Sequence, residues 1–279
     1  MKTILVRLTD SKLNAVRNGH EIWTTLEGEN PGGSLKDRMV IAELEHALKD
    51  GRLGPGDTVA EISAGSTALS IAVHSRRLGL KCALFLPKDT STELKQELET
   101  LEAELHFCEP TLAAYQEFDE FCATRPVWRF DQMRRPELKN HYAAWARTEI
   151  APQFNSIDYV VAAVGTGLSL FGIRDGLMPQ RGALSAEPRE PRLIHGIRNL
   201  EKENFGPQDL CQINQIEKRI VLSAKEFFQT NYVETDHGPI YISDSFRVVL
   251  GAVERIASLN AKLTLFAVGS HNRRIENSI

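Results

Sequence analysis

The sequence has little of several features that mark specialised classes of protein. Its 279 residues include four cysteines, which lack C-x-x-C or Cys/His ligand spacing, so neither a zinc site nor a disulfide framework is expected. No apolar run is long enough to span a bilayer, and the first one is too short for a signal peptide. The net charge is only −4, and the basic runs are short. We therefore expect a cytoplasmic protein without nucleic-acid or membrane partners.

The order of apolar runs and helical patterns predicts the fold class. With 42% hydrophobic and 25% charged residues, the composition is that of a globular protein large enough for two lobes. Short apolar runs such as "TVAEI" and "KCALFLP" alternate with helical patterns such as "STELKQELETLEA", and a second set begins at "DYVVAAV". This alternation is typical of βαβ units. We expect an α/β fold of two lobes, each a largely parallel sheet flanked by helices.

Four predicted strands end beside small or polar residues. Ligands of open parallel sheets bind outside the carboxyl ends of the strands. The candidates for one site are therefore the strand ends before Ser63, Asp131, Gly165 and Ser270.

A lysine closely follows a tight turn in the stretch "ENPGGSLKDRM". Ser34 and Asp37 have the spacing of a capping box, which predicts that a helix begins here and that Lys36 lies in its first turn. The unpaired N–H groups of a first turn disfavour a cation, and burial would favour the neutral amine further. A neutral amine is the form that attacks a carbonyl. Taken alone, the pattern fits a capped turn with a solvated lysine as well.

Two loops rich in glycine and hydroxyl groups connect a predicted strand to a helix. In "VVAAVGTGLSLFGI", the glycines and hydroxyls at residues 165–169 form a candidate phosphate site at the start of a helix. In "EISAGSTALSIA", residues 63–67 form a second cluster of N–H and hydroxyl groups, able to hold a carboxylate without an arginine. Each loop alone is also compatible with an ordinary turn or helix cap.

Five stretches resemble those of one enzyme family, in the expected order along the chain. "NPGGSLKDR" is similar to the cofactor-lysine motif of fold type II pyridoxal-phosphate enzymes, the cysteine synthase and cystathionine β-synthase family. "GTGLSLFG" resembles the family's phosphate loop, and "SAGSTA" resembles its substrate-carboxylate loop. "RFDQMRR" and "LFAVGSHNRR" resemble stretches that supply a glutamine and a serine to the site. The resemblance thus covers most of the chain.

The resemblance implies a role for each matched residue. Lys36 would form the Schiff base with pyridoxal 5′-phosphate and then move the α-proton of the substrate. The residues implied to bind the cofactor are Lys36, Ser66, Gly165, Thr166, Gly167, Leu168, Ser169 and, at the pyridine nitrogen, Ser270. The residues implied to bind the substrate carboxylate are Ser63, Ala64, Gly65, Thr67 and Gln132.

The resemblance also implies an activity and an organisation. The activity is β-replacement on a serine- or cysteine-like amino acid through an aminoacrylate intermediate, as in cysteine synthase. Two alternatives stay open: β-elimination, as in cysteine desulfhydrase or serine/threonine dehydratase, and a non-catalytic paralogue acting as a binding or scaffold protein. A homodimer is implied, with a larger cofactor-binding domain of residues 1–38 and 144–279 and a smaller, mobile substrate-loop domain of residues 39–143.

Departures from the family pattern keep those alternatives open. Ser66 stands where the family has an asparagine that contacts the phenolic oxygen of the cofactor, Ala64 replaces a serine, and Leu168 replaces a glycine. His195 and Arg198 lie where the family has a glycine loop at the mouth of the active site. They either contact the substrate or form an exposed loop pair.

Overall fold

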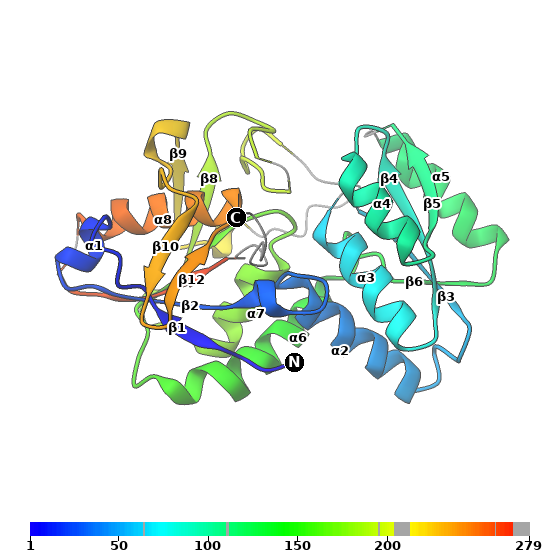
Figure 1. Cartoon of the computed structure of the whole chain (residues 1–279), viewed down its shortest axis with the longest axis horizontal. Helices are drawn as coiled ribbons and strands as arrows, with labels where there is room; N and C mark the ends of the chain where they lie inside the picture. The colour runs from blue at the N-terminus through cyan, green and yellow to red at the C-terminus, as the bar shows by residue number, and fades with distance from the viewer. Residues whose placement is uncertain (64, 110–111, 195, 204–212, 260, 270–279) are drawn as a thin grey trace, which may run out of the picture. The chain divides into compact units, whose positions relative to one another are not determined.

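The chain forms two compact units, each built around its own main β-sheet (Figure 1). The computed structural model describes residues 1–63, 65–109, 112–194, 196–203, 213–259 and 261–269. The first unit comprises Met1–Glu29, Tyr142–Asn204 and Cys211–Ile279, and the second comprises Asn30–His141 and Phe205–Leu210. Residues 30–38, which the sequence analysis assigns to the larger domain, thus group with the second unit. The roles of the two domains stay predictions.

Six strands form the main sheet of the first unit, in the spatial order β1-β2-β12-β7-β8-β9. Their bounds are β1 Leu5–Arg7, β2 Glu21–Thr25, β7 Tyr159–Ala163, β8 Ala183–Pro188, β9 Lys218–Leu222 and β12 Thr264–Val268. The β1 and β2 strands pair antiparallel, and all other neighbours in this sheet are parallel. Because Ala162 pairs with Val268, the carboxyl ends of β7 and β12 lie side by side, as two of the expected strand ends should.

Helices and a hairpin complete the first unit. The helices are α1 Asn14–Arg17, α7 Leu168–Leu177 and α8 Asp244–Ala257, and the hairpin joins β10 Tyr232–Thr235 to β11 Gly238–Tyr241. Helix α8 packs on β7, β8, β9 and β12, and its apolar side forms much of the core. The Ser243 side chain caps α8 by accepting a hydrogen bond from the N–H of Phe246.

The segment from Pro136 to Ile150 is helical but not uniform. A 3-10 turn at Pro136–Leu138 leads into α6 at Lys139–Trp145, and a π-helix follows at Ala146–Ile150. The boundary between the units falls inside α6. In the part of the chain that the structure describes, no helix has both the length and the apolarity needed to cross a bilayer.

Four parallel strands form the sheet of the second unit, in the order β5-β4-β3-β6. Their bounds are β3 Thr58–Ile62, β4 Lys81–Pro87, β5 Glu104–Cys108 and β6 Val127–Arg129. The helices are α2 Lys36–Lys49, α3 Ser66–Arg77, α4 Thr92–Thr100 and α5 Leu112–Thr124. The β3 and β6 strands are neighbours, so the segments that follow them, which include Ser63 and Asp131, lie at the same edge.

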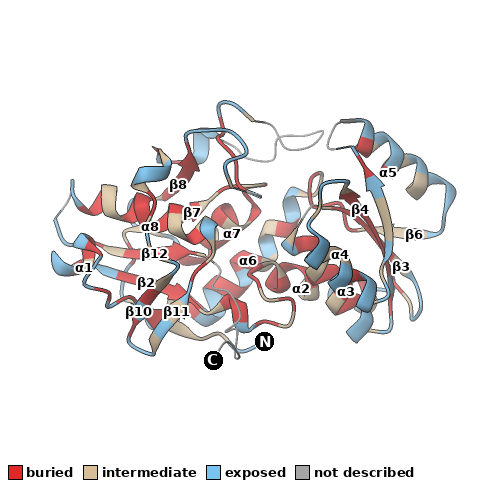
Figure 2. Ribbon diagram, turned by 45° about the horizontal axis from the view of Figure 1, so that its top comes forward, coloured by how far each residue is buried: buried red, intermediate tan, exposed pale blue. Residues whose placement is uncertain are grey.

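Burial follows the pattern expected of a parallel sheet with helices against it. Figure 2 shows the central strands β3 and β4 as largely buried, whereas α4 presents an exposed side and α3 is exposed only at its ends. Val40, Leu44 and Ala47, at helical spacing in α2, are fully buried. The apolar parts of β3 and β4 therefore belong to the core of this unit, and a polar residue there needs a specific explanation.

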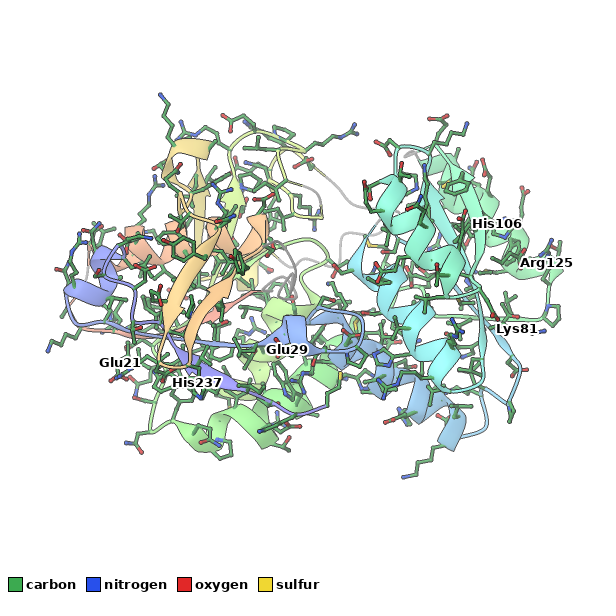
Figure 3. All side chains as sticks on the ribbon, in the orientation of Figure 1. Glu21, Glu29, Lys81, His106, Arg125 and His237 are labelled. Carbon is green, nitrogen blue, oxygen red and sulfur yellow. The ribbon has the colours of Figure 1, made fainter. Side chains whose placement is uncertain are left out.

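The edge strand β5 carries charged and polar side chains. Glu104 accepts a hydrogen bond from Arg125 at 2.8 Å, and its Oε1 lies 2.9 Å from Nε2 of His106. His106 and Arg125 are labelled in Figure 3, and the His106 ring stacks on Phe85 at 4.6 Å between ring centres. A charged edge resists pairing with the edge of another sheet. We therefore assign this charged cluster to protection of the sheet edge and not to a binding or catalytic site.

Candidate functional site

Lys36 is the first residue of α2, as the sequence predicts, but the capping differs in detail. The residue at the cap position is Leu35, and no side chain caps it. The Ser34 hydroxyl accepts a hydrogen bond from the Lys36 N–H at 3.2 Å, and the Asp37 carboxylate accepts one from the Ser34 N–H at 3.2 Å. The two side chains of the predicted capping box thus fix this turn, but the Ser34 hydroxyl binds the N–H of Lys36 and not that of Asp37.

Asp37 ties the turn before Lys36 to helix α3. Its carboxylate accepts hydrogen bonds from the N–H of Gly32, at 3.1 and 3.2 Å, and Oδ1 lies 2.7 Å from Nε2 of His74. The side chains of Asp37 and His74 are both fully buried. A Cβ atom on Gly32 would lie 2.5 Å from Oδ1 of Asp37, so this close approach requires glycine. The position of Lys36 is therefore set by a buried polar network.

The environment of Lys36 favours its neutral form. Burial lowers the pKa of the amine to about 8, and the nearby charge of Glu61 only partly offsets this. Among the described residues, Nζ of Lys36 has no hydrogen-bond partner. An amine with a lowered pKa is available at neutral pH as a nucleophile and as a proton acceptor.

Glu61 is the buried polar residue that the β3 strand has to accommodate. Its side chain is fully buried, and Oε2 accepts a hydrogen bond from the N–H of Gln132 at 3.1 Å. Oε1 has no partner within the described ranges. Burial raises the pKa of Glu61 to about 8, and the charge of Asp131 acts in the same direction. The Glu61 side chain thus anchors the backbone at Gln132, just after β6. Its carboxyl group titrates near neutral pH.

Replacing Glu61 by glutamine is expected to flatten the pH dependence of stability. A carboxyl whose pKa rises from the ordinary 4.5 to about 8 on folding contributes stability that is fully present below pH 4.5 and is lost as the pH rises to 8. Between pH 5 and 7.5, the wild type should lose about 3 kcal/mol more in free energy of unfolding than Glu61→Gln. Urea unfolding at both pH values measures this difference. The exposed Glu99→Gln variant is the control, and equal slopes for all three proteins would contradict the assignment.

Two residues predicted to bind the substrate carboxylate meet in the second unit. The Thr67 hydroxyl donates a hydrogen bond to Oε1 of Gln132 at 3.0 Å, although 65 residues separate them, and both side chains are buried. Because the carboxamide oxygen is occupied, the Nε2 group of Gln132 remains as a donor, and it has no acceptor among the residues described here. The structure therefore places one predicted donor beside the predicted carboxylate loop.

The other described residues of that loop surround the start of α3. The N–H of Ser63 donates to the carbonyl of Phe85 and so extends the pairing of β3 with β4. Gly65 is the cap residue of α3, and Ser66, the first residue of the helix, is exposed. The exposed N–H groups of a helix start are suited to an anion. Ala64 lies outside the described residues.

Asp131 holds the turn between β6 and Gln132 in an uncommon conformation. Its φ angle is +50°, in the left-handed region that only asparagine, aspartate and glycine adopt readily. Oδ2 of Asp131 accepts hydrogen bonds from Arg129 and Arg134, both at 3.0 Å. Together with Glu61, these contacts fix the backbone at Gln132. Glu61 is not among the predicted site residues, although the sequence shows a glutamate inside the apolar run "TVAEI", and Asp131 is predicted only as the residue that follows one of the four strand ends.

The predicted phosphate loop lies in the first unit, between β7 and α7. Gly167 has a φ angle of +88° and precedes the first residue of the helix, Leu168. The Leu168 N–H donates to the hydroxyl of Thr166 at 3.4 Å, and the N–H of Phe171 donates to the Gly167 carbonyl. Within the described residues, no acceptor contacts the N–H groups of Gly165, Thr166, Gly167 or Ser169. The leucine in place of a glycine is buried and leaves this group of donors intact.

Two further sequence-based expectations concern the edges of this site. Ser270, predicted to meet the pyridine nitrogen, lies outside the described residues, and so does His195. Arg198 is described and is buried, so the expectation that it belongs to an exposed pair of loop residues is wrong. Among the residues that the structure describes, no group of His, Cys, Asp or Glu side chains is arranged to hold a metal ion.

Solved structures with a similar fold identify the class. O-ureido-L-serine synthase superimposes with a TM-score of 0.82 at 20% identity, covering 97% of this chain and 89% of that one. O-acetylserine dependent cystathionine β-synthase from Helicobacter pylori has a TM-score of 0.77 at 18% identity, covering 100% and 95%. At this identity the likeness concerns the fold. The fold class is that of fold type II pyridoxal-phosphate enzymes.

The chain belongs to the pyridoxal-phosphate dependent enzyme family, whose model matches residues 2–207. Cysteine synthase from a Flavobacterium species is 32% identical over 186 residues, which is 64% of this chain and 60% of that protein. Cysteine synthase B from Salmonella typhimurium is 30% identical over 195 residues, covering 67% and 64%. The matches thus span less than two thirds of these relatives. The cofactor of the family is pyridoxal phosphate.

Each unit contains residues that fit this cofactor. In the second unit, Lys36 presents an amine with a lowered pKa for the aldehyde of the cofactor. In the first unit, the loop at 165–169 has N–H groups without protein acceptors among the described residues, at the start of a ten-residue helix, which suits a phosphate. The chemistry of the two donor sets agrees with the family membership.

Proposed function

We propose that this protein catalyses β-replacement on a serine- or cysteine-like amino acid. The observation that carries the proposal is the hydrogen bond between Thr67 and Gln132, at 3.0 Å. It joins the two segments that the resemblance assigns to the substrate carboxylate, in the unit that contains Lys36. The cysteine synthase relatives and the family model support the same activity.

In this proposal, the residues of the second unit bind the substrate and move its proton. The first-turn N–H groups of α3 and Nε2 of Gln132 hold the carboxylate, without an arginine. When bound, pyridoxal phosphate draws electrons from the α-carbon and so stabilises the charge left there when a proton is removed. Nζ of Lys36 holds the cofactor and, once released by the substrate amine, accepts the α-proton. The β-substituent leaves with the electron pair of its bond to Cβ, a nucleophile then adds at Cβ, and Nζ of Lys36 returns a proton to the α-carbon.

The loop at 165–169 would bind the phosphate of the cofactor. Ser66 would lie near the phenolic oxygen of the cofactor, and Ser270 at the pyridine nitrogen, as the resemblance implies. We also propose a homodimer in the cytoplasm, with the substrate-loop domain mobile. These finer assignments rest on the resemblance and on the separate geometry of each loop.

Product analysis tests the proposal. Purified protein with pyridoxal phosphate is incubated with O-acetylserine, O-phosphoserine, serine or cysteine, each with and without sulfide as nucleophile. We expect one of the amino acids to change the visible absorption and to give a new amino acid only when sulfide is present. Pyruvate and ammonia as the main products, with or without sulfide, would instead establish β-elimination. A spectrum that no amino acid changes, with no product, would indicate a non-catalytic protein.

A further inference from the structure

A buried arginine contacts the proposed phosphate loop from the segment after β8. Arg198 is 1% exposed and is the largest of the fully buried side chains among the described residues. Its backbone N–H donates to the carbonyl of Val164 at 3.0 Å, and its Nε donates to the carbonyl of Gly165 at 2.9 Å. A third donor, Nη1, contacts the carbonyl of Glu203 at 3.1 Å. One residue therefore binds two consecutive carbonyl groups of the loop.

These two contacts set the direction of the N–H groups in the loop. A trans peptide is planar, and its N–H points away from its C=O. Because the carbonyls of Val164 and Gly165 both point toward Arg198, the N–H groups of Gly165 and Thr166 both point away from it. The β7 strand ends at Ala163, and the bend that follows departs from the alternation of N–H groups in an extended strand; the two contacts with Arg198 hold this bend. Successive N–H groups on one side of the chain form a concave site for an anion.

The rest of the segment holds Arg198 in place. The side chain of Asn199 donates from Nδ2 to the carbonyl of Pro188 at 3.1 Å, and its N–H donates to Glu203. The N–H of Leu200 donates to the carboxylate of Glu187, a fully buried residue that also binds Arg219. The backbone that follows Arg198 is thus anchored to the end of β8, and the guanidinium keeps a permanent positive charge next to the loop.

We propose that Arg198 is a positioning residue that orients the loop at 165–169 for the phosphate ester of the cofactor. The inference rests on the proposed role of that loop. The side chain of Arg198 acts through the Gly165 carbonyl, which turns the Thr166 N–H toward the phosphate, and through its positive charge, which favours a dianion nearby. The Val164 carbonyl is held by the backbone N–H of the same residue, a contact that the variants keep. It therefore strengthens the binding of the phosphate group and has no effect on the aldehyde end.

The test compares pyridoxal phosphate with pyridoxal, which lacks the phosphate. Both are titrated into the full chain freed of cofactor, and binding is read from the absorbance band that depends on Lys36. Arg198→Met should raise the Kd for pyridoxal phosphate about tenfold, as expected for the loss of hydrogen bonds to a charged group. The Kd for pyridoxal should not change. The matched control is Arg189→Met, an exposed arginine of the same unit, which should leave both values unchanged.

A second variant covers the case in which Arg198→Met does not fold. Arg198→Lys keeps the charge but cannot make the same contacts, so it should weaken pyridoxal phosphate binding about threefold and leave pyridoxal unaffected. Equal weakening of both compounds, or a Kd for pyridoxal phosphate equal to that of the wild type in the Arg198 variants, would overturn the inference. If the wild type binds pyridoxal and pyridoxal phosphate with the same Kd, the assignment of the loop at 165–169 to the phosphate is wrong. If neither compound gives a band that depends on Lys36, the proposed function itself fails.

Discussion

Replacement of Lys36 by alanine should abolish the visible absorbance of the protein with pyridoxal phosphate and lower kcat/KM by at least about a thousandfold. The reason is that one amine is proposed to hold the cofactor and to move the α-proton, so a single substitution removes both roles. The pKa of this amine, about 8, also predicts that the cofactor-free protein forms the absorbance band with pyridoxal phosphate faster as the pH rises to about 8, because Nζ loses its proton. Absorbance spectra and steady-state kinetics across about pH 6 to 9.5 measure both effects.

A matched control separates this effect from a change in helix α2. Lys49→Ala removes an exposed lysine at the other end of the same helix and should retain both absorbance and rate. Added primary amines should restore part of the proton transfer in Lys36→Ala, because they supply the missing base. Undiminished turnover by Lys36→Ala would exclude this lysine as the base.

Replacement of Asp37 by alanine should destabilise the second unit by about 3–5 kcal/mol, the cost typical of leaving buried polar partners unpaired. The carboxylate accepts hydrogen bonds from the N–H groups of Gly32 and Ser34 and contacts His74, and both ionisable side chains are fully buried. Alanine would leave these two N–H groups, in the turn before Lys36, and the His74 ring without their buried partner. Urea unfolding followed by circular dichroism measures the change.

The control for Asp37 is an exposed aspartate that also accepts a hydrogen bond from a glycine N–H. Asp57 accepts from the N–H of Gly54 at 2.7 Å, and Asp57→Ala should cost less than about 1 kcal/mol, because water replaces the lost bond. Equal losses for the two variants would show that the buried network around Asp37 contributes no more than a surface turn does.

Much of the local structure follows from the sequence because its causes are local. The turn and cap residues predict that Lys36 lies in the first turn of a helix, as the structure confirms. The cap position falls on Leu35, although the Asp37 carboxylate accepts the hydrogen bond from the Ser34 N–H that the capping box predicts. The four strand ends are confirmed as two neighbouring pairs, one in each sheet.

Residues that act through distant contacts could not be predicted in the same way. Glu61 matters because the sheet buries it beside the Gln132 segment, and no local pattern shows that contact. Arg198 gains its proposed role from the Val164 and Gly165 carbonyls, more than thirty residues earlier in the chain. The domain boundary also depends on packing, since residues 30–38 group with helix α2 and not with the first strands.

The central claim is that Lys36 holds pyridoxal phosphate covalently. The most direct test is to reduce the protein with borohydride in the presence of the cofactor, digest it and map the modified peptide by mass spectrometry. The account predicts one stoichiometric modification, located on Lys36, and none in Lys36→Ala. A modification at another lysine, or spread over surface lysines at low occupancy, would contradict it.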